Sequence, residues 1–202
     1  MKVLNIALCM LASVCLMGCR NAGSPSGSAE PETIVAESTV ETVTEGSDDD
    51  RGYAVKVGDQ APDFTIEYLD GRSEKLSDLQ GKLVMIQFTA SWCGVCRKEM
   101  PYIERDIWQK YKKHPGFALI GIDLKENKET TAKFAETMQV TYPLTLDLDG
   151  SRFGLYTEPG AGVTRNILVD KEGKIVLLTR LFEMEEFNEM VEFIDHYLSA
   201  NF

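Results

Sequence analysis

Cys93 and Cys96 form a Cys-x-x-Cys pair at the point where a long apolar run gives way to a segment with helical spacing. The apolar run, residues 83–88, is typical of a strand that is buried on both faces. Residues 96–113 place their apolar side chains on one side of a predicted helix. Two intervening residues let this helix begin at the first cysteine, so the two sulfur atoms can bond across one turn. The pattern predicts a redox-active dithiol in an α/β fold.

The predicted helix start gives the two cysteines different chemistry. Unpaired N–H groups and the helix dipole favour an anion at a helix N-terminus, so we expect Cys93 to be the nucleophile. A fall in the pKa of Cys93 from about 8.5 to about 7 would raise its thiolate fraction at neutral pH from a few per cent to about half. Cys96 is expected inside the first turn, where it is shielded and can resolve a mixed disulfide.

Alternating strand and helix patterns continue along the chain. Residues 64–69 and 74–76 flank Asp70-Gly71, which suits the tight turn of a β-hairpin. The remaining predicted elements are a buried strand at 117–122, helices at 129–138, 150–156 and 183–198, and a strand-turn-strand unit at 166–179. Pro101 should kink the helix that follows the cysteines. Together these patterns predict an α/β fold with a central mixed β-sheet flanked by helices.

The first residues have the composition of an export signal. Lys2 precedes an apolar run of about 15 residues, shorter than the roughly 20 needed to span a membrane. The run ends in Gly18-Cys19, which resembles the lipobox of bacterial lipoproteins, although an ordinary signal peptide is the alternative. We therefore expect residues 1–18 to be a lipoprotein signal peptide and Cys19 to carry the lipid that anchors the protein to a membrane. Cys9 and Cys15 would leave with the signal, so that only Cys93 and Cys96 remain as thiols.

Residues 19–52 are rich in Ser, Thr, Glu, Gly and Pro and contain no aromatic residue. They are predicted to be a flexible acidic linker. This segment holds eight acidic residues against Arg20 and Arg51, so it supplies much of the net charge of −11. No basic stripe follows, which argues against a nucleic-acid partner. Residues 53–202 are expected to form the single folded domain.

The segment from Phe88 to Pro101, Phe-Thr-Ala-Ser-Trp-Cys-Gly-Val-Cys-Arg-Lys-Glu-Met-Pro, resembles the active-site segment of the TlpA/ResA-like thioredoxins. Residues 58–64 and 169–175 resemble two further segments of that family, which belongs to the AhpC/TSA–redoxin superfamily. The resemblance covers residues 53–202 and implies a thioredoxin-like fold with an N-terminal β-hairpin extension and a central insertion. It also implies a periplasmic, membrane-tethered thiol–disulfide oxidoreductase. Such proteins need no cofactor and reduce oxidised protein substrates, in some members during cytochrome c maturation. Their electrons come from a membrane thiol-transporter.

Neighbours of the cysteines have expected roles. Glu99 matches the acidic residue of the family three positions after the second cysteine, where its carboxylate can move a proton during exchange. The alternative for Glu99 is a first-turn glutamate that only complements the helix dipole. Trp92 is expected to shield the disulfide and to form a contact platform for substrates, with core packing as the alternative. Gly94-Val95 contains no histidine that would overstabilise the thiolate, which favours a reductant over a strong oxidant.

The chain departs from the family at Thr164, which stands where the family usually has a cis-proline. A cis peptide bond before a residue other than proline costs about 3–4 kcal/mol, so we expect a trans bond and a differently shaped loop. Thr164-Arg165 instead resembles the arginine-bearing strand of peroxiredoxins. One hypothesis is therefore that Arg165 approaches Cys93 and stabilises its thiolate. The alternative is an ordinary surface or strand-end arginine.

Three other functions remain open. A peroxiredoxin-like thiol peroxidase with antioxidant activity would use Cys93, although Thr89 lies four residues before Cys93 where peroxiredoxins place a threonine three before. A metal- or cluster-binding module is disfavoured because zinc wants four ligands, while only two cysteines and the isolated His114 and His196 are present. A purely structural disulfide is disfavoured because so short a loop restricts the unfolded chain little. No metal site is expected.

Overall fold

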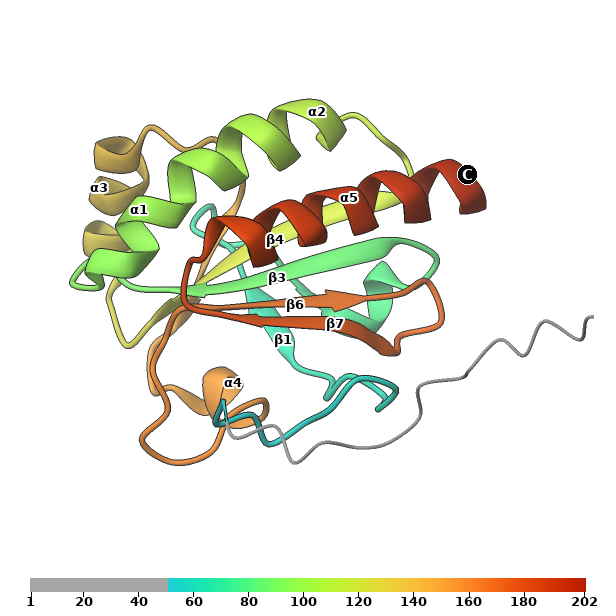
Figure 1. The fold of residues 1–202 in the computed structure, drawn as a ribbon. Helices are drawn as coiled ribbons and strands as arrows, with labels where there is room; N and C mark the ends of the chain where they lie inside the picture. The colour runs from blue at the N-terminus through green and yellow to red at the C-terminus, as the bar shows by residue number, and fades with distance from the viewer. Residues whose placement is uncertain (1–50) are drawn as a thin grey trace, which may run out of the picture. The chain divides into compact units, whose positions relative to one another are not determined.

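Five strands form the central sheet of the structure, a computed structural model that describes residues 51–202. The predicted signal peptide, Cys19 and all but the last two residues of the predicted linker lie outside the described residues. The strand order is β5 (Leu144–Asp147), β4 (Phe117–Leu124), β3 (Leu83–Thr89), β6 (Arg165–Val169) and β7 (Ile175–Arg180). Strands β3, β4 and β5 run parallel, while β6 pairs antiparallel with β3 and β7 antiparallel with β6. The predicted central mixed sheet is confirmed (Figure 1).

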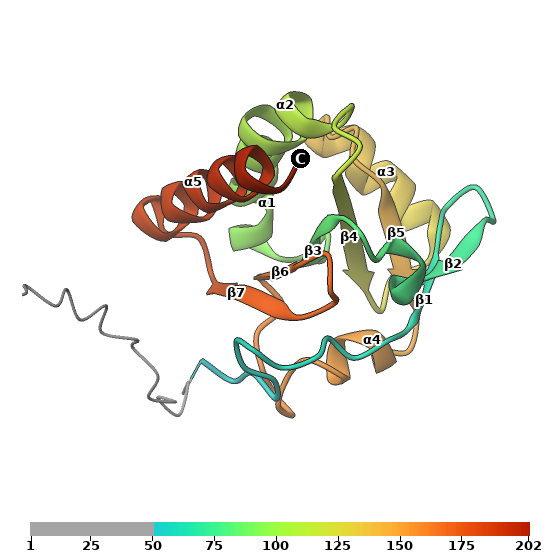
Figure 2. The same ribbon diagram turned by 90° about the vertical axis from the view of Figure 1, so that its right-hand side faces the viewer.

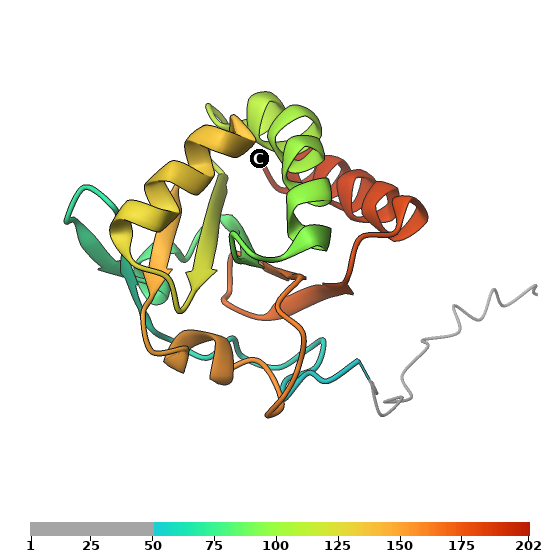
Figure 3. The same ribbon diagram turned by 90° about the vertical axis from the view of Figure 1, so that its left-hand side faces the viewer.

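Helices cover the sheet on both faces. One face carries the long helical segment after the cysteines, together with α3 (Lys128–Met138) and α5 (Met184–Asn201) (Figures 1 and 2). The other face carries the short helix α4 (Ser151–Gly154) and the chain that leads into β1 (Figure 3). None of the helices within residues 51–202 has the length and apolar character needed to cross a lipid bilayer.

The predicted hairpin is present as a separate two-stranded sheet. Strand β1 (Thr65–Glu67) pairs antiparallel with β2 (Ser73–Lys75), and the 3-10 helix η1 (Leu76–Leu79) follows. Gly71 turns the chain between the strands with a φ of +90°, a conformation that costs glycine little. Strand β5 was not predicted from the sequence, because its four residues are too few to show a period.

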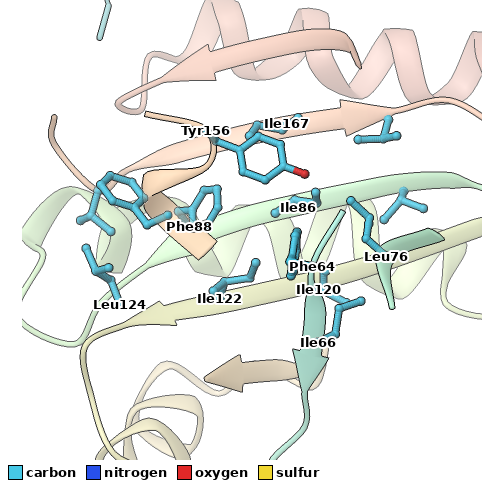
Figure 4. Packing of buried hydrophobic residues seen from close by; sticks show 14 of the residues in the cluster. Phe64, Ile66, Leu76, Ile86, Phe88, Ile120, Ile122, Leu124, Tyr156 and Ile167 are labelled. Atoms are coloured by element: carbon cyan, nitrogen blue, oxygen red, sulfur yellow. The ribbon is translucent and has the colours of Figure 1, made fainter. Parts of the chain in front are cut away.

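The core consists of two apolar clusters, one on each face of the sheet. Strand β3 is buried along its whole length, as predicted. Val84, Ile86 and Phe88 point into the cluster shown in Figure 4, whereas Leu83 and Met85 point to the face covered by α5. Phe88 packs edge-on against Phe153 of α4 with ring centroids 5.2 Å apart. This packing holds the carboxyl end of β3, from which the cysteine loop departs.

The helical segment after the cysteines changes its winding after Pro101. It consists of α1 (Gly94–Tyr102), the π-helical segment η2 (Ile103–Trp108) and α2 (Gln109–Tyr111). Proline has no N–H to donate, and its ring crowds the carbonyl one turn earlier, so the regular ladder is interrupted near this residue. The predicted single helix with an irregularity at Pro101 is therefore observed as three joined helical pieces.

The domain begins slightly earlier than predicted. Arg51, assigned to the linker, donates hydrogen bonds to Glu186 and to the carbonyl of Leu178. The carbonyl of Gly52 accepts a hydrogen bond from the N–H of Glu158. Residues 51 and 52 are therefore held by the folded domain.

Candidate active site

Cys93 and Cys96 are joined by a disulfide at the junction of β3 and α1, with Cα atoms 5.3 Å apart. Cys93 is the N-cap residue of α1, with an extended backbone, and its Sγ accepts a hydrogen bond of 3.1 Å from the N–H of Cys96. Sulfur here takes the place that the side-chain oxygen of serine or aspartate fills at other helix starts. The helix begins directly after Cys93, at the position that the Cys-x-x-Cys spacing predicted.

The two sulfur-bearing residues differ in accessibility. Cys93 is 8% exposed and Cys96 is fully buried. Trp92, beside Cys93, is 66% exposed, so its alternative role in core packing is wrong. Gly94 is exposed, and Val95 packs partly buried against the apolar cluster. Trp92 and Gly94 are therefore the exposed residues beside the disulfide, and Cys93 is the more accessible of the two sulfur-bearing residues.

Thr164 lies against both sulfur atoms. Its Oγ1 is 3.2 Å from Sγ of Cys93 and 3.2 Å from Sγ of Cys96. The residue is buried, and its carbonyl accepts a hydrogen bond of 3.1 Å from the N–H of Leu181. The loop before β6 thus brings a hydroxyl group directly to the redox centre.

Glu99 is 1% exposed, and amide side chains surround its carboxyl group. Asn166 Nδ2 donates to Oε1 over 2.6 Å, and Gln87 Nε2 donates to Oε2 over 3.4 Å. Burial raises the pKa of Glu99 to about 7, against the opposing effect of the two hydrogen bonds. Burying an ionisable carboxyl group costs free energy, and a glutamate that only complemented the helix dipole would not need to be buried. The site therefore contains an acid that can change protonation near neutral pH.

Gln87 and Asn166 are functional candidates that the sequence interpretation missed. They face each other across β3 and β6, and Asn166 Nδ2 also donates to Oγ1 of Thr179. Tyr142 completes the network through a hydrogen bond of 2.7 Å to Oε1 of Gln87. The available signals were Gln87, the one polar residue inside the apolar run 83–88, and Asn166, a polar residue at the start of the apolar run 167–169.

A second acidic group, also missed, holds the loop that leads to Cys93. Glu126 accepts hydrogen bonds of 2.6 Å from both the N–H and the Oγ of Ser91. Asp123 is buried at the end of β4, and burial together with the neighbouring Glu126 carboxyl raises its pKa. Because Asp123 pairs in register with Thr89, the parallel sheet brings this acidic group beside the cysteine loop.

Arg165 requires a correction. The residue is fully buried at the first position of β6, so it is a strand-end arginine, as the alternative expected, but not a surface one. Its Nε donates to the carbonyl of Gly162 and its Nη2 to that of Arg51, while the guanidinium lies 4.3 Å from the ring centroid of Tyr53. Among the hydrogen bonds of the described residues none links Arg165 to Cys93, since its donors bind the carbonyls of Gly162 and Arg51. The hypothesis that Arg165 stabilises the thiolate is therefore not supported, and the peroxidase alternative loses one of its arguments.

The two histidines, His114 and His196, lie away from the cysteines in the sequence, and His114 lies between aromatic side chains. His114 packs edge-on against Tyr111 and Phe202. Within residues 51–202, no three His, Cys, Asp or Glu side chains gather in a way that could hold a metal ion.

Comparisons with known proteins agree with this geometry. The profile of the AhpC/TSA family matches residues 57–178. The thiol-disulfide oxidoreductase ResA of Geobacillus thermodenitrificans is 34% identical over 143 residues, which cover 70% of this chain and 79% of that protein. The solution structure of a proposed protein disulfide isomerase from Bacteroides thetaiotaomicron is 56% identical, with a TM-score of 0.71, over 73% of this chain and 93% of that one. A proposed DsbE-type thiol:disulfide interchange protein from Chlorobium tepidum is 28% identical, with a TM-score of 0.61, over 72% of this chain and 99% of that one.

Proposed function

The chain belongs to the AhpC/TSA family and is a thiol–disulfide oxidoreductase of the ResA/DsbE type, and we propose that it reduces disulfide bonds of extracytoplasmic proteins. One observation carries the proposal: Cys93 caps the start of α1 and is the more exposed member of a disulfide whose other sulfur belongs to a fully buried residue. This arrangement separates an attacking sulfur from a resolving one.

The proposed reaction consists of two exchanges. The Cys93 thiolate attacks one sulfur of a substrate disulfide, forms a mixed disulfide and releases the other substrate sulfur as a thiolate. Cys96 then loses its proton, with Glu99 as the receiving group, and attacks Sγ of Cys93. The second substrate thiolate leaves, the substrate has gained two electrons, and the Cys93–Cys96 disulfide is the oxidised product.

The reductive direction rests on the residues between the cysteines. Neither Gly94 nor Val95 carries a charge or a hydrogen-bonding side chain that would stabilise a Cys93 thiolate. Stabilising the reduced form makes a dithiol more oxidising, so the absence of such groups between the cysteines favours a reductant. A measured reduction potential near −120 mV, the value for the strong oxidant DsbA, would contradict this direction.

We place this activity outside the cytoplasm. The support is the signal-like segment 1–18 and the lipobox-like Gly18-Cys19, by which the protein would be lipid-anchored to a bacterial membrane and face the periplasm. A membrane thiol-transporter would then supply electrons to the Cys93–Cys96 disulfide. Apocytochrome c, whose cysteines must be reduced before haem attachment, is one proposed substrate class.

Trapping tests the function directly. Full-length protein with Cys96→Ser should accumulate disulfide-linked partners on Cys93 in cells, because the resolving thiol is gone. The double variant Cys93→Ser/Cys96→Ser is the matched control and should trap nothing. Capture of partners by both variants would contradict the role of Cys93. Capture by neither variant, with rapid consumption of hydrogen peroxide in the presence of a thiol reductant, would favour the peroxidase alternative.

A further inference from the structure

The Thr164 hydroxyl occupies an unusual position at the redox centre. Its Oγ1 lies 3.2 Å from each of the two sulfur atoms. Among the hydrogen bonds of residues 51–202, Oγ1 takes part in these two alone. We infer that Thr164 is a catalytic residue whose hydroxyl donates a hydrogen bond to the sulfur that carries negative charge, first Cys93 and then Cys96. The inference rests on the proposed exchange function.

The physical reason is the difference between sulfur states. A hydroxyl has one hydrogen to donate, and a thiolate can only accept, whereas a neutral sulfur is a weak acceptor. A charge-assisted hydrogen bond is roughly twice as strong as a neutral one. The contact to Thr164 therefore strengthens when the disulfide opens and charge appears, and it favours the ionised form of the attacking thiol.

The fold holds the hydroxyl in place before the reaction. The Thr164 carbonyl accepts the N–H of Leu181, and the next residue, Arg165, pairs with Phe88 of β3. The Arg165 guanidinium also donates to the carbonyl of Gly162, which closes the loop on the other side of Thr164. These anchors fix the backbone that carries the Thr164 hydroxyl, and the side chain itself is buried, so little reorganisation is needed when charge develops.

Equal distances to the two sulfurs suit a donor that serves both exchanges. During the attack on substrate, the charged sulfur belongs to Cys93. During resolution, Cys96 loses its proton and becomes the thiolate that attacks Sγ of Cys93, which leaves the second substrate sulfur with the electron pair. The Thr164 hydrogen can follow the charge by rotation about the Cβ–Oγ1 bond alone, without movement of the backbone.

Removing the hydroxyl while keeping the size of the side chain tests the inference. In full-length protein with Cys96→Ser, the only remaining thiol of the folded domain is Cys93, and the pH dependence of its alkylation by iodoacetamide reports its ionisation. Thr164→Val should lower the ionisation constant of Cys93 about tenfold, and Thr164→Ser should keep it within about twofold. With both cysteines present, Thr164→Val should make the reduction potential more negative by up to about 30 mV, the equivalent of a tenfold change for a two-electron couple.

A matched control separates this effect from stability. Thr145 is a buried threonine whose Oγ1 donates to the carbonyl of Gly121, so Thr145→Val removes a buried hydroxyl away from the sulfurs. It should lower stability without changing the ionisation of Cys93. If Thr164→Val does not fold, Thr164→Ala and Thr164→Ser give the same comparison.

Two results would overturn the inference: no change in the ionisation of Cys93 on loss of the hydroxyl, or equal changes in Thr164→Val and Thr164→Ser, which would indicate packing. Either result would leave the proposed function standing as long as Cys93→Ser abolishes substrate reduction. Loss of the proposed function itself would instead appear as unchanged substrate reduction in Cys93→Ser.

Discussion

Asn166 Nδ2 donates a hydrogen bond of 2.6 Å to Oε1 of Glu99 and thereby links β6 to α1 inside the core. Both residues are buried, and burial raises the pKa of Glu99 to about 7. The hydrogen bond acts in the opposite direction because it stabilises the carboxylate. A carboxyl group balanced in this way can accept a proton from a thiol at neutral pH and return it later.

Replacing Glu99 with glutamine should slow the resolving step and remove its pH dependence. In the wild type, the step should accelerate as pH rises through about 7, since the carboxylate that we propose as the acceptor of the Cys96 proton then forms. We expect a loss of roughly 100-fold above pH 7, the lower range for removal of a general base. Rapid-quench measurement of mixed-disulfide decay checks this. Glu129→Gln, an exposed glutamate of α3, is the control and should behave as the wild type.

Replacing Asn166 with alanine should move the same pH profile upward. The variant loses the hydrogen bond that lowers the pKa of Glu99, so the carboxylate forms at a higher pH, by about one unit. Thr179→Val, which changes the other partner of Asn166 Nδ2, should leave the midpoint in place. A midpoint that stays fixed or moves down in Asn166→Ala would show that the amide does not set the protonation of Glu99.

Glu99 should also make the folded protein less stable as pH rises. The pKa of Glu99 is about 7 in the folded state against 4.5 for an unperturbed glutamate, so the folded state binds more protons between these values. Stability therefore falls from about pH 4.5 to about pH 7 and then levels off, by an order of 3 kcal/mol in total. Glu99→Gln should lack this loss. Urea unfolding of the oxidised protein at pH 5 and pH 8 gives the comparison, and parallel curves for the two proteins would contradict it.

Trp92→Ala should impair protein substrates more than small disulfides. An exposed side chain contributes little to stability, so the free energy of unfolding should change by less than about 0.5 kcal/mol. Loss of an aromatic contact of about 1.5 kcal/mol should lower kcat/KM for a protein disulfide roughly tenfold. Val57→Ala, another exposed apolar residue, is the matched control. Equal losses for a protein disulfide and for a small aromatic disulfide would show that Trp92 is not a docking platform.

Arg165→Met should lower the free energy of unfolding of the domain. It should change the ionisation constant of Cys93 far less than Thr164→Val does. The variant loses two charge-assisted hydrogen bonds to carbonyls and the contact with the Tyr53 ring. We expect a loss of about 2 kcal/mol in unfolding free energy, measured by urea titration. A large fall in the ionisation constant of Cys93 with little loss of stability would revive direct stabilisation of the thiolate by Arg165.

The sequence sufficed for those parts of the fold that depend on local pattern. The continuous apolar run of β3, the Asp70-Gly71 turn and the cysteine spacing each act within a few residues, and the structure bears out the elements that they predicted. The family resemblance was also confirmed. Strand β5 is different, because its four residues are defined by pairing with β4 and not by their own period.

The surroundings of the cysteines depend on pairing between distant residues. Gln87 and Asn166 meet only because β3 and β6 run antiparallel in one particular register. Asp123 reaches the cysteine loop through the parallel pairing of β3 and β4. One hypothesis turned Arg165 toward Cys93, but the carbonyls of Gly162 and Arg51 take its donors, which the sequence alone does not reveal. Successive side chains of a strand point to opposite faces. Once Asn166 turns to Glu99, Arg165 must turn to Tyr53.

The N–H of Cys96 already donates to Sγ of Cys93 while the disulfide is closed. A thiolate at that position would need the same donor, so opening the bond exchanges a covalent link for a charge without unwinding the first turn of α1. The start of α1 is thus arranged in advance for the charge that reduction places on Cys93, and the donor that a thiolate needs is supplied by backbone that the helix has already fixed.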